Sequence, residues 1–389
     1  MGHERRAAEI LADSAVLRGL AAEGVSVWLG DVGRPELTSG SLRTWITTVR
    51  VTGVALSASA LTREFRRRED HAYLDQLGRV ARQRVSPDAM VRALLAYDAR
   101  WACDLLAHVS TDTDGLDGWV CGELDARLAH DRRSALEEAR AFAVAVGRPN
   151  FLVTIAATDA GLDVVRACVA EGIGVHAALV HSAERYGQVL DAYWDGLDQA
   201  HRDGRTAPGT CAVSLEAAAV EAAVDEQLGE LGTTAAGALR GRTALAFARV
   251  VHDLHERRLD SRRWRALRKA GARPQRLVWS GAGTGGDPGG PGQLARHVRH
   301  VEEIVAWRTA HLLSPLAVAE AARRARPHGD SLSGEAAAAL DVMAALRRHG
   351  IHPGCLAEDV QRSRLRELAR GRDELLDAVR STPSIRTYL

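Results

Sequence analysis

Phe151-Leu152-Val153-Thr154-Ile155-Ala156 is a short, mostly apolar run that follows Pro149-Asn150 and precedes Ala157-Thr158-Asp159. Apolar runs of this length, bounded by residues that break regular structure, are typical of buried β-strands. Thr158-Asp159 is typical of a helix start, because a threonine side chain caps backbone N–H groups and an acidic residue suits the first turn. The stretch therefore predicts a strand that passes directly into a helix.

The same unit, a short apolar run followed by a helical pattern of ten residues or more, recurs along the chain. The other runs are Val25–Leu29, Gly53–Ser57, Gly118–Leu124, Gly174–Val180, Cys211–Ser214, Arg276–Ser280 and Trp307–Leu313. Eight such units predict an α/β fold, a parallel (β/α)8 TIM barrel with its helices outside. The last strand is the least regular of the eight, since residues 293–313 fit one long helix equally well.

The length of 389 residues fits one barrel domain with additional helices at both ends. Residues 1–22 are expected to form a leading helix and residues 357–389 a C-terminal helical extension. The extension is rich in Arg and Glu, which are expected to form a solvated face. The glycine-rich residues 281–292 fit either a phosphate cradle or a mobile loop.

The charge balance excludes several kinds of partner. The chain has 51 basic and 50 acidic residues and a net charge of +1, so we expect neither nucleic acid nor an anionic membrane as its partner. No apolar run is long enough to span a bilayer, and we expect a cytoplasmic protein. The five cysteines lack metal-ligand spacing and are expected to be reduced thiols. Lys269 is the only lysine.

The run from Asn150 to Thr158 resembles a strand of the transaldolases, whose hallmark reads Asn, three apolar or aromatic residues, Lys, Ile, Pro, Ala, Thr. The resemblance, especially to the actinobacterial type, extends from Gly24 to about Val360. Further matching segments are Gly24–Leu29, Leu37–Leu42, Thr113–Gly118, Ser182–Tyr186, Ala238–Ala244 and Ala272–Arg276. The resemblance implies a barrel of the class I aldolase/transaldolase type.

The positions that carry function in that family have mostly changed. The resemblance places the first-strand aspartate on Gly30, or on Asp31 after a shift of one residue, and the substrate-binding asparagine on Ser57. It places the Schiff-base lysine on Thr154, the fifth-strand asparagine on His176 and a phosphate-binding arginine on Ala219. Glu123 and Ser214 are the family residues that remain.

A Schiff base requires a primary amine, and neither Thr154 nor an arginine can supply one. Lys269 lies in a charged helical segment before the seventh strand, on the side of a barrel opposite the catalytic mouth. It is expected to be a solvated surface residue, so transaldolase activity should be absent.

The residues that replace the family's polar groups suggest a changed ligand. Strand alternation would place Trp119, Cys121 and Glu123 on one inner face, and the fifth strand would add His176, Ala178 and Val180. The mouth is therefore expected to be less polar and to suit a bulkier or more apolar ligand than a sugar phosphate.

Glu123 is the first catalytic candidate, because a carboxyl group inside an apolar barrel has a raised pKa and can act as a general acid or base. The alternative is that Glu123 is a residue without a catalytic role, retained from the family and held by a buried hydrogen bond. His176 is the second candidate, since an imidazole titrates near neutrality. A core histidine whose ring nitrogens are hydrogen-bonded would look the same in sequence. Asp31 would complete the catalytic group.

The remaining site residues are expected to contact a substrate. They are Ser57, Trp119, Cys121, Thr154 and Ser214, and Cys121 fits either a reactive thiol or a small buried residue. No cofactor is expected; the alternative is a divalent cation held by Asp31, Glu123 and His176 from three strand ends.

Two hypotheses remain open. The first is a Schiff-base-free lyase, isomerase or cyclase that acts on a small-molecule intermediate of specialised metabolism, as apolar as an isoprenoid. The second is a pseudoenzyme that keeps the barrel as a binding or scaffolding protein. An enzyme should retain an open, shaped pocket, whereas in a scaffold side chains such as Trp119 should fill it.

Overall fold

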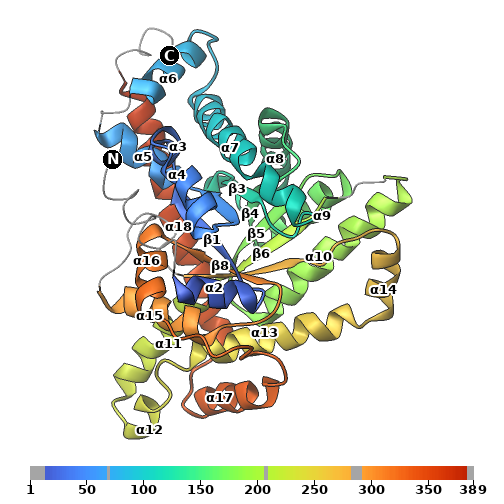
Figure 1. Ribbon diagram of the computed structural model, residues 1–389, viewed down its shortest axis with the longest axis vertical. Coiled ribbons are helices and arrows are strands. Elements are labelled where there is room, and N and C mark those ends of the chain that lie inside the picture. The colour runs from blue at the N-terminus through green and yellow to red at the C-terminus, as the bar shows by residue number, and fades with distance from the viewer. Residues whose placement is uncertain (1–13, 68–70, 206–208, 282–290, 383–389) are drawn as a thin grey trace.

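The structure, a computed structural model, describes residues 14–67, 71–205, 209–281 and 291–382. Its strands form one closed, parallel barrel in which each strand pairs with the next along the chain and β8 pairs with β1 (Figure 1). The strands are β1 (Ser26–Val32), β2 (Gly53–Leu56), β3 (Trp119–Glu123), β4 (Phe151–Ala156), β5 (Val175–Val180), β6 (Cys211–Leu215), β7 (Arg276–Ser280) and β8 (Thr309–Leu313). The predicted (β/α)8 barrel is confirmed.

Helices surround the barrel and connect its strands. Those of the first half are α2 (Ala15–Ala22), α3 (Arg34–Thr38), α4 (Ser41–Thr44), η1 (Trp45–Val49), α5 (Ala58–Arg67), α6 (His71–Ala81), α7 (Pro87–Asp112), η2 (Ala126–Leu128), α8 (Arg132–Val146) and α9 (Asp159–Ala170). Those of the second half are α10 (Ala183–Arg202), α11 (Ala217–Leu231), α12 (Thr234–Gly237), α13 (Thr243–Leu259), α14 (Arg262–Lys269), α15 (Pro291–Glu303), α16 (Pro315–Arg324), α17 (Ala336–Arg348) and α18 (Pro353–Arg380).

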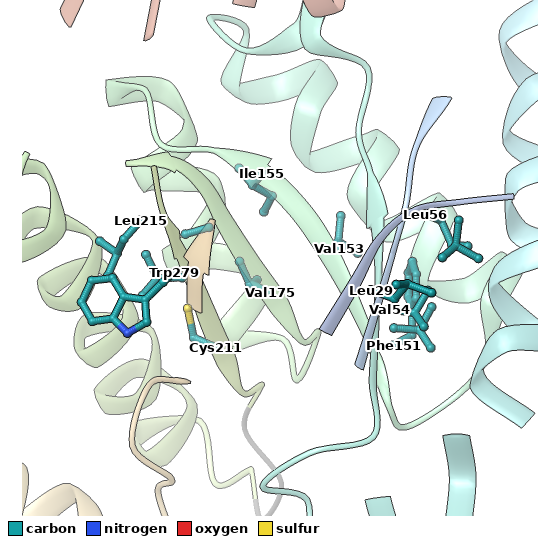
Figure 2. Close-up of a cluster of buried hydrophobic side chains, with 14 of the residues drawn as sticks. Leu29, Val54, Leu56, Phe151, Val153, Ile155, Val175, Cys211, Leu215 and Trp279 are labelled. Atoms are coloured by element: carbon teal, nitrogen blue, oxygen red, sulfur yellow. The ribbon is translucent and has the colours of Figure 1, made fainter. Parts of the chain in front are cut away.

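The strands are apolar on both faces because each face is buried. Inside the barrel lie Trp28, Trp119, Cys121, Leu152, Ala212, Val278, Ala310 and Leu312. Alternate residues of the same strands point outward and pack under the helices, and Figure 2 shows part of this outer layer, including Val153, Ile155, Val175 and Trp279. Burial on both sides explains why the runs read as continuously apolar.

The central stretch folds as its sequence predicts. β4 ends at Ala156, and α9 begins at Asp159 with Thr158 as its N-cap. The Thr158 hydroxyl accepts a hydrogen bond of 3.0 Å from the backbone N–H of Gly161. The cap therefore sets the direction in which the chain leaves the barrel mouth.

Two β-bulges change which side chains reach the mouth. The pairing of β1 with β2 shifts register between Leu29 and Val32, and Asp31 takes a left-handed φ of 59°. The pairing of β5 with β6 shifts between Ala177 and Val180, where Leu179 has a φ of 60°. An extra residue in one strand reverses the alternation beyond it, so the predicted inward position of Val180 is wrong and Leu179 lines the mouth instead.

The other predicted segments can be placed with similar detail. The long-helix alternative for residues 293–313 is wrong, because α15 ends at Glu303 and β8 begins at Thr309. The leading helix is described only as α2, since residues 1–13 lie outside the described residues. Most of the glycine-rich segment, residues 282–290, also lies outside them.

The last helix, α18, covers the carboxyl ends of the strands. It packs against α5, α7, α11 and η2, and in Figure 1 it runs in red past the barrel from α11 to α5. Gln361 Nε2 donates hydrogen bonds of 3.0 Å to the Ala157 carbonyl and 2.9 Å to the Leu179 carbonyl. The extension is helical as predicted, but its expected role as a solvated face is only half right, because one face forms a roof over the mouth.

Candidate functional site

A cavity of about 450 Å³ lies at the carboxyl ends of the strands, beneath α18. Its walls come from the ends of most of the strands and from the start of α5. Its lining includes the carboxylates of Asp31, Glu123, Asp125, Glu216, Glu367 and Glu374 and the guanidinium groups of Arg63, Arg364, Arg370 and Arg372. These charges stand beside apolar wall residues, and α18 and α5 bring in several of them that the strand pattern does not reveal.

Asp31 enters this cavity through the bulge in β1. Its carboxylate accepts hydrogen bonds from the Ser57 hydroxyl at 2.8 Å and from two nitrogens of Arg63 at 3.2 and 2.7 Å. Asp31 lines the cavity, whereas Gly30 does not. Asp31 is held as an ion pair with Arg63, so its geometry suits orienting Arg63 and Ser57 better than exchanging protons.

Glu123 stands at the end of β3 and faces the same cavity. One of its carboxylate oxygens accepts a hydrogen bond of 3.2 Å from the backbone N–H of Ala58. Burial raises the pKa of Glu123 to about 7, and the negative charges of Asp31 and Glu216 add to this effect while Arg364 opposes it. A carboxyl group of this kind exchanges a proton near neutral pH.

Thr154, His176 and Ser214 form one hydrogen-bonded row across β4, β5 and β6. Thr154 Oγ1 lies 3.0 Å from His176 Nδ1, and Ser214 Oγ lies 2.6 Å from His176 Nε2. Burial lowers the pKa of His176 to about 4. The expectation that His176 titrates near neutrality is therefore wrong: the ring is neutral at pH 7 and donates to one hydroxyl while accepting from the other.

Glu216 and His181 form a carboxylate–histidine pair that the sequence pattern did not indicate. Glu216 follows β6 and lines the cavity, and its carboxylate lies 3.1 Å from Nε2 of the buried His181, which follows β5. Burial acts to raise the pKa of Glu216, but the contact with His181 and the charge of Arg364 outweigh it and lower that pKa. His181 directly follows the predicted strand Gly174–Val180, and Glu216 stands two residues after Ser214, where another predicted strand ends. These positions were the available signal.

Arg364 is the second residue that the sequence pattern missed. It lies on α18, pairs with Glu367 and interacts electrostatically with both Glu216 and Glu123. It therefore lies within electrostatic reach of the two candidate acid–base groups. An i,i+3 pair on an Arg-rich helix looks like a surface feature, and only the packing of α18 over the barrel reveals its role.

Two of the predicted substrate contacts lie elsewhere. Trp119 and Cys121 point into the barrel as alternation predicts, but neither lines the cavity beneath α18. Trp119 instead lines a cavity of about 730 Å³ at the opposite end, together with the first residues of β6, β7 and β8. Cys121 is buried, and burial raises the pKa of its thiol, so it behaves as a small core residue.

The described residues contain no group of three or more His, Cys, Asp or Glu side chains arranged to hold a metal ion. Asp31 is paired with Arg63, and both ring nitrogens of His176 contact hydroxyl groups. The alternative of a cation held by Asp31, Glu123 and His176 is therefore not supported. Within the same residues, no helix is both long and apolar enough to cross a bilayer.

No amine reaches the cavity from the described residues. Lys269, the only lysine of the chain, is exposed at the end of α14, which precedes β7 on the side where the strands begin. Ala219, in the first turn of α11, is absent from the cavity lining. The position that the resemblance assigns to the Schiff-base lysine is occupied by Thr154, and it does face the cavity.

Comparison with known proteins gives a consistent family. Residues 36–256 match the family model described as Transaldolase/Fructose-6-phosphate aldolase. A transaldolase of Thermobifida fusca is 38% identical over 364 residues, which span 93% of this chain and 97% of that relative. A transaldolase of Acidothermus cellulolyticus is 35% identical over 93% of this chain and 95% of its own length, and transaldolase 1 of Streptomyces coelicolor is 36% identical over 95% and 96%. The chain therefore belongs to the transaldolase/fructose-6-phosphate aldolase family.

Proposed function

We propose that this member of the family is an enzyme that works by acid–base catalysis without a Schiff base, as a lyase, isomerase or cyclase. The observation that carries the proposal is the pair of carboxyl groups in one cavity, Glu123 with a pKa raised to about 7 and Glu216 with a lowered pKa. Environments that separate the pKa values of two carboxyl groups assign them different roles. Glu123 supplies the proton and Glu216 accepts one.

The proposed step needs only these two groups. Glu216, ionised and held by His181, removes a proton from one atom of the substrate, and protonated Glu123 delivers a proton to another atom or to a leaving oxygen. Afterwards Glu216 is neutral and Glu123 is ionised, and exchange with water restores both. No oxidant, reductant or amine is required, which agrees with Thr154 at the lysine position.

The sequence suggested His176 as the partner of Glu123, and its surroundings argue against that role. A pKa of about 4 leaves its imidazole a weak base, and both ring nitrogens already contact hydroxyl groups. We propose that His176, Thr154 and Ser214 form an uncharged polar surface that contacts the substrate. Their hydrogen bonds fix the ring, so the substrate meets a preorganised surface.

The proposed substrate is a small molecule with an apolar body and at least one polar group, of the kind found in specialised metabolism. The charges of Arg63 and Arg364 stand beside apolar wall residues of the same cavity, which are Leu56, Leu124, Leu128, Ile155, Leu179, Leu365 and Leu368. Its volume of about 450 Å³ falls in the range of sites for small organic ligands.

The open cavity favours an enzyme over a scaffold. The barrel is closed at β2 and β8, and Trp119 lies at its other end and does not fill the mouth. A barrel retained only for binding a protein partner would not need two carboxyl groups with opposed pKa shifts in an open cavity.

The proposal can be tested by proton exchange. The protein is incubated in deuterated water with a panel of sugar phosphates and isoprenoid alcohols and diphosphates, and deuterium uptake into each compound is followed by mass spectrometry. We expect uptake into at least one compound, reduced by about 10²-fold or more in Glu123→Gln and in Glu216→Gln. Glu226→Gln, an exposed change on α11, is the matched control. Uptake that survives both cavity variants would contradict the assignment.

A further inference from the structure

A second cavity, of about 360 Å³, lies beside the catalytic one. The first turns of α10 and α18 both line it, as does the end of α17. His181 forms part of its wall, while the partner of His181, Glu216, lines the catalytic cavity. The His181–Glu216 pair thus connects the walls of two separate cavities.

The two helices bring positive potential to this cavity. α10 has 20 residues and α18 has 28, and the first turn of such a helix leaves backbone N–H groups without intrahelical partners. At α10 the Ser182 side chain accepts a hydrogen bond from the Arg185 N–H. At α18 the His352 side chain makes no capping bond, Pro353 has no N–H, and the Cys355 N–H bonds to the His352 carbonyl, so Gly354 supplies the first-turn donor. Two converging helix N-termini favour a negatively charged ligand.

His181 provides independent evidence for a ligand. The residue is 3% exposed, its Nε2 lies 3.1 Å from Glu216, and its Nδ1 has no hydrogen-bond partner among the described residues. Buried polar atoms in folded proteins nearly always have a partner. The unpartnered Nδ1 of a residue that lines a cavity faced by two helix N-termini therefore indicates a missing hydrogen-bond partner.

The charged side chains around His181 leave room for an anion. Arg185 of α10 lines the cavity and pairs with the exposed Asp159, whereas Arg347 of α17 makes no ion pair with any described carboxylate. Glu184 and Glu358 also line the cavity, but both are exposed and can turn to solvent. Arg347 is exposed as well, so these side chains alone do not set the sign of the charge, and the preference for an anion rests on the two helix N-termini.

We propose that the cavity between the N-termini of α10 and α18 binds a phosphate group, held by backbone N–H groups, Arg347 and Nδ1 of a protonated His181. His181 then donates through Nδ1 to the phosphate and through Nε2 to Glu216. Binding takes up one proton and strengthens the hold on the ionised form of Glu216. The cavity is thus a regulatory site that acts on the proposed base, and its binding step does not depend on the proposed reaction.

Isothermal titration calorimetry of the full chain tests this site, with inorganic phosphate and glycerol 3-phosphate as separate probes at pH 6.5. Titrations in two buffers of different ionisation heat measure the uptake of protons. His181→Gln keeps an amide N–H for Glu216 and removes the second donor, Arg347→Gln removes the cation, and the exposed neighbour Arg348→Gln is the control. We expect both cavity variants to weaken binding at least about tenfold and the control to leave it unchanged.

The outcomes separate the site from the proposed reaction. Binding of inorganic phosphate marks the free ion as a ligand, and binding of glycerol 3-phosphate alone marks a phosphorylated metabolite. No binding of either probe, or binding that both cavity variants retain, would overturn the proposal. Glu123→Gln should bind phosphate as the wild type does. Phosphate binding at the second cavity would therefore still be observed if the proposed acid–base role of Glu123 were wrong.

Discussion

Thr154 Oγ1 lies 3.0 Å from His176 Nδ1, so the strand position that resembles the family's Schiff-base lysine here anchors a neutral imidazole. His176 Nε2 contacts Ser214 Oγ at 2.6 Å, which completes a row of three side chains from β4, β5 and β6. Hydrogen bonds therefore fix the side chains of this row at the position where the family resemblance would place a reactive lysine. The two carboxyl groups of the proposed acid–base chemistry, Glu123 and Glu216, lie in the remaining walls.

Thr154→Val should destabilise the fold, because it keeps the shape of the side chain and leaves His176 Nδ1 buried without a partner. We expect the free energy of unfolding to fall by about 1–3 kcal/mol in urea denaturation. Thr111→Val is the matched control, since that hydroxyl bonds to the Ala107 carbonyl on the exposed side of α7 and its loss should cost no more than about 0.5 kcal/mol. Equal effects in the two variants would argue against the row.

Glu123 should make the stability of the protein depend on pH near neutrality. Its pKa is about 7 in the folded state and about 4.5 when unfolded, so the folded state binds the proton more tightly. The stabilisation is complete below about pH 4.5 and is lost as the pH rises through 7, a change of about 3 kcal/mol. Glu123→Gln should remove this part of the dependence. Identical pH profiles for wild type and variant would contradict the raised pKa.

Much of the fold could be predicted from sequence because burial on both faces leaves a strong apolar pattern in each strand. Phe151–Ala156 and the Thr158 cap are local features, and the structure adopts them as expected. The bulge at Leu179 is not visible in that pattern, since a continuous run of apolar residues reads the same with or without an extra residue.

The candidate site was predictable only where it lies on the strands. Glu123 and Thr154 face the cavity because strand alternation brings them there, and Asp31 does so through its bulge. Arg364 could not be placed, because its approach depends on how α18 packs across the barrel more than 200 residues after Glu123. Trp119 was placed on the correct face but at the wrong end, since alternation does not give depth along the barrel.

Glu216 should influence stability in the opposite pH range. Its pKa is lowered in the folded state, so its contribution is present above about pH 4.5 and is lost as the pH falls further. Glu216→Gln should therefore flatten the acid limb of a urea-denaturation series between about pH 3 and 6. Glu226→Gln, an exposed change on α11, is the control and should leave that limb unchanged. An acid limb that Glu216→Gln does not alter would remove Glu216 as the candidate base.

Gln361 should hold the roof of the cavity in place. Its amide joins α18 to the Ala157 and Leu179 carbonyls, and Gln361→Ala removes both hydrogen bonds. We expect faster hydrogen exchange in α18, measured by mass spectrometry, with little change in the barrel strands. Arg362→Ala, which removes an exposed pair with Asp359, serves as the control. Unchanged exchange in α18 would show that packing alone secures the roof.

The most direct test of Schiff-base-free chemistry is the intact mass of the protein after incubation with fructose 6-phosphate and borohydride. Borohydride reduces a Schiff base to a stable amine, so an active lysine would retain the sugar-derived fragment. With Thr154 in the cavity and Lys269 exposed on α14, we expect the mass to remain that of the unmodified chain. A covalent sugar adduct at Lys269 would contradict the absence of Schiff-base chemistry and return the protein to the mechanism of its family.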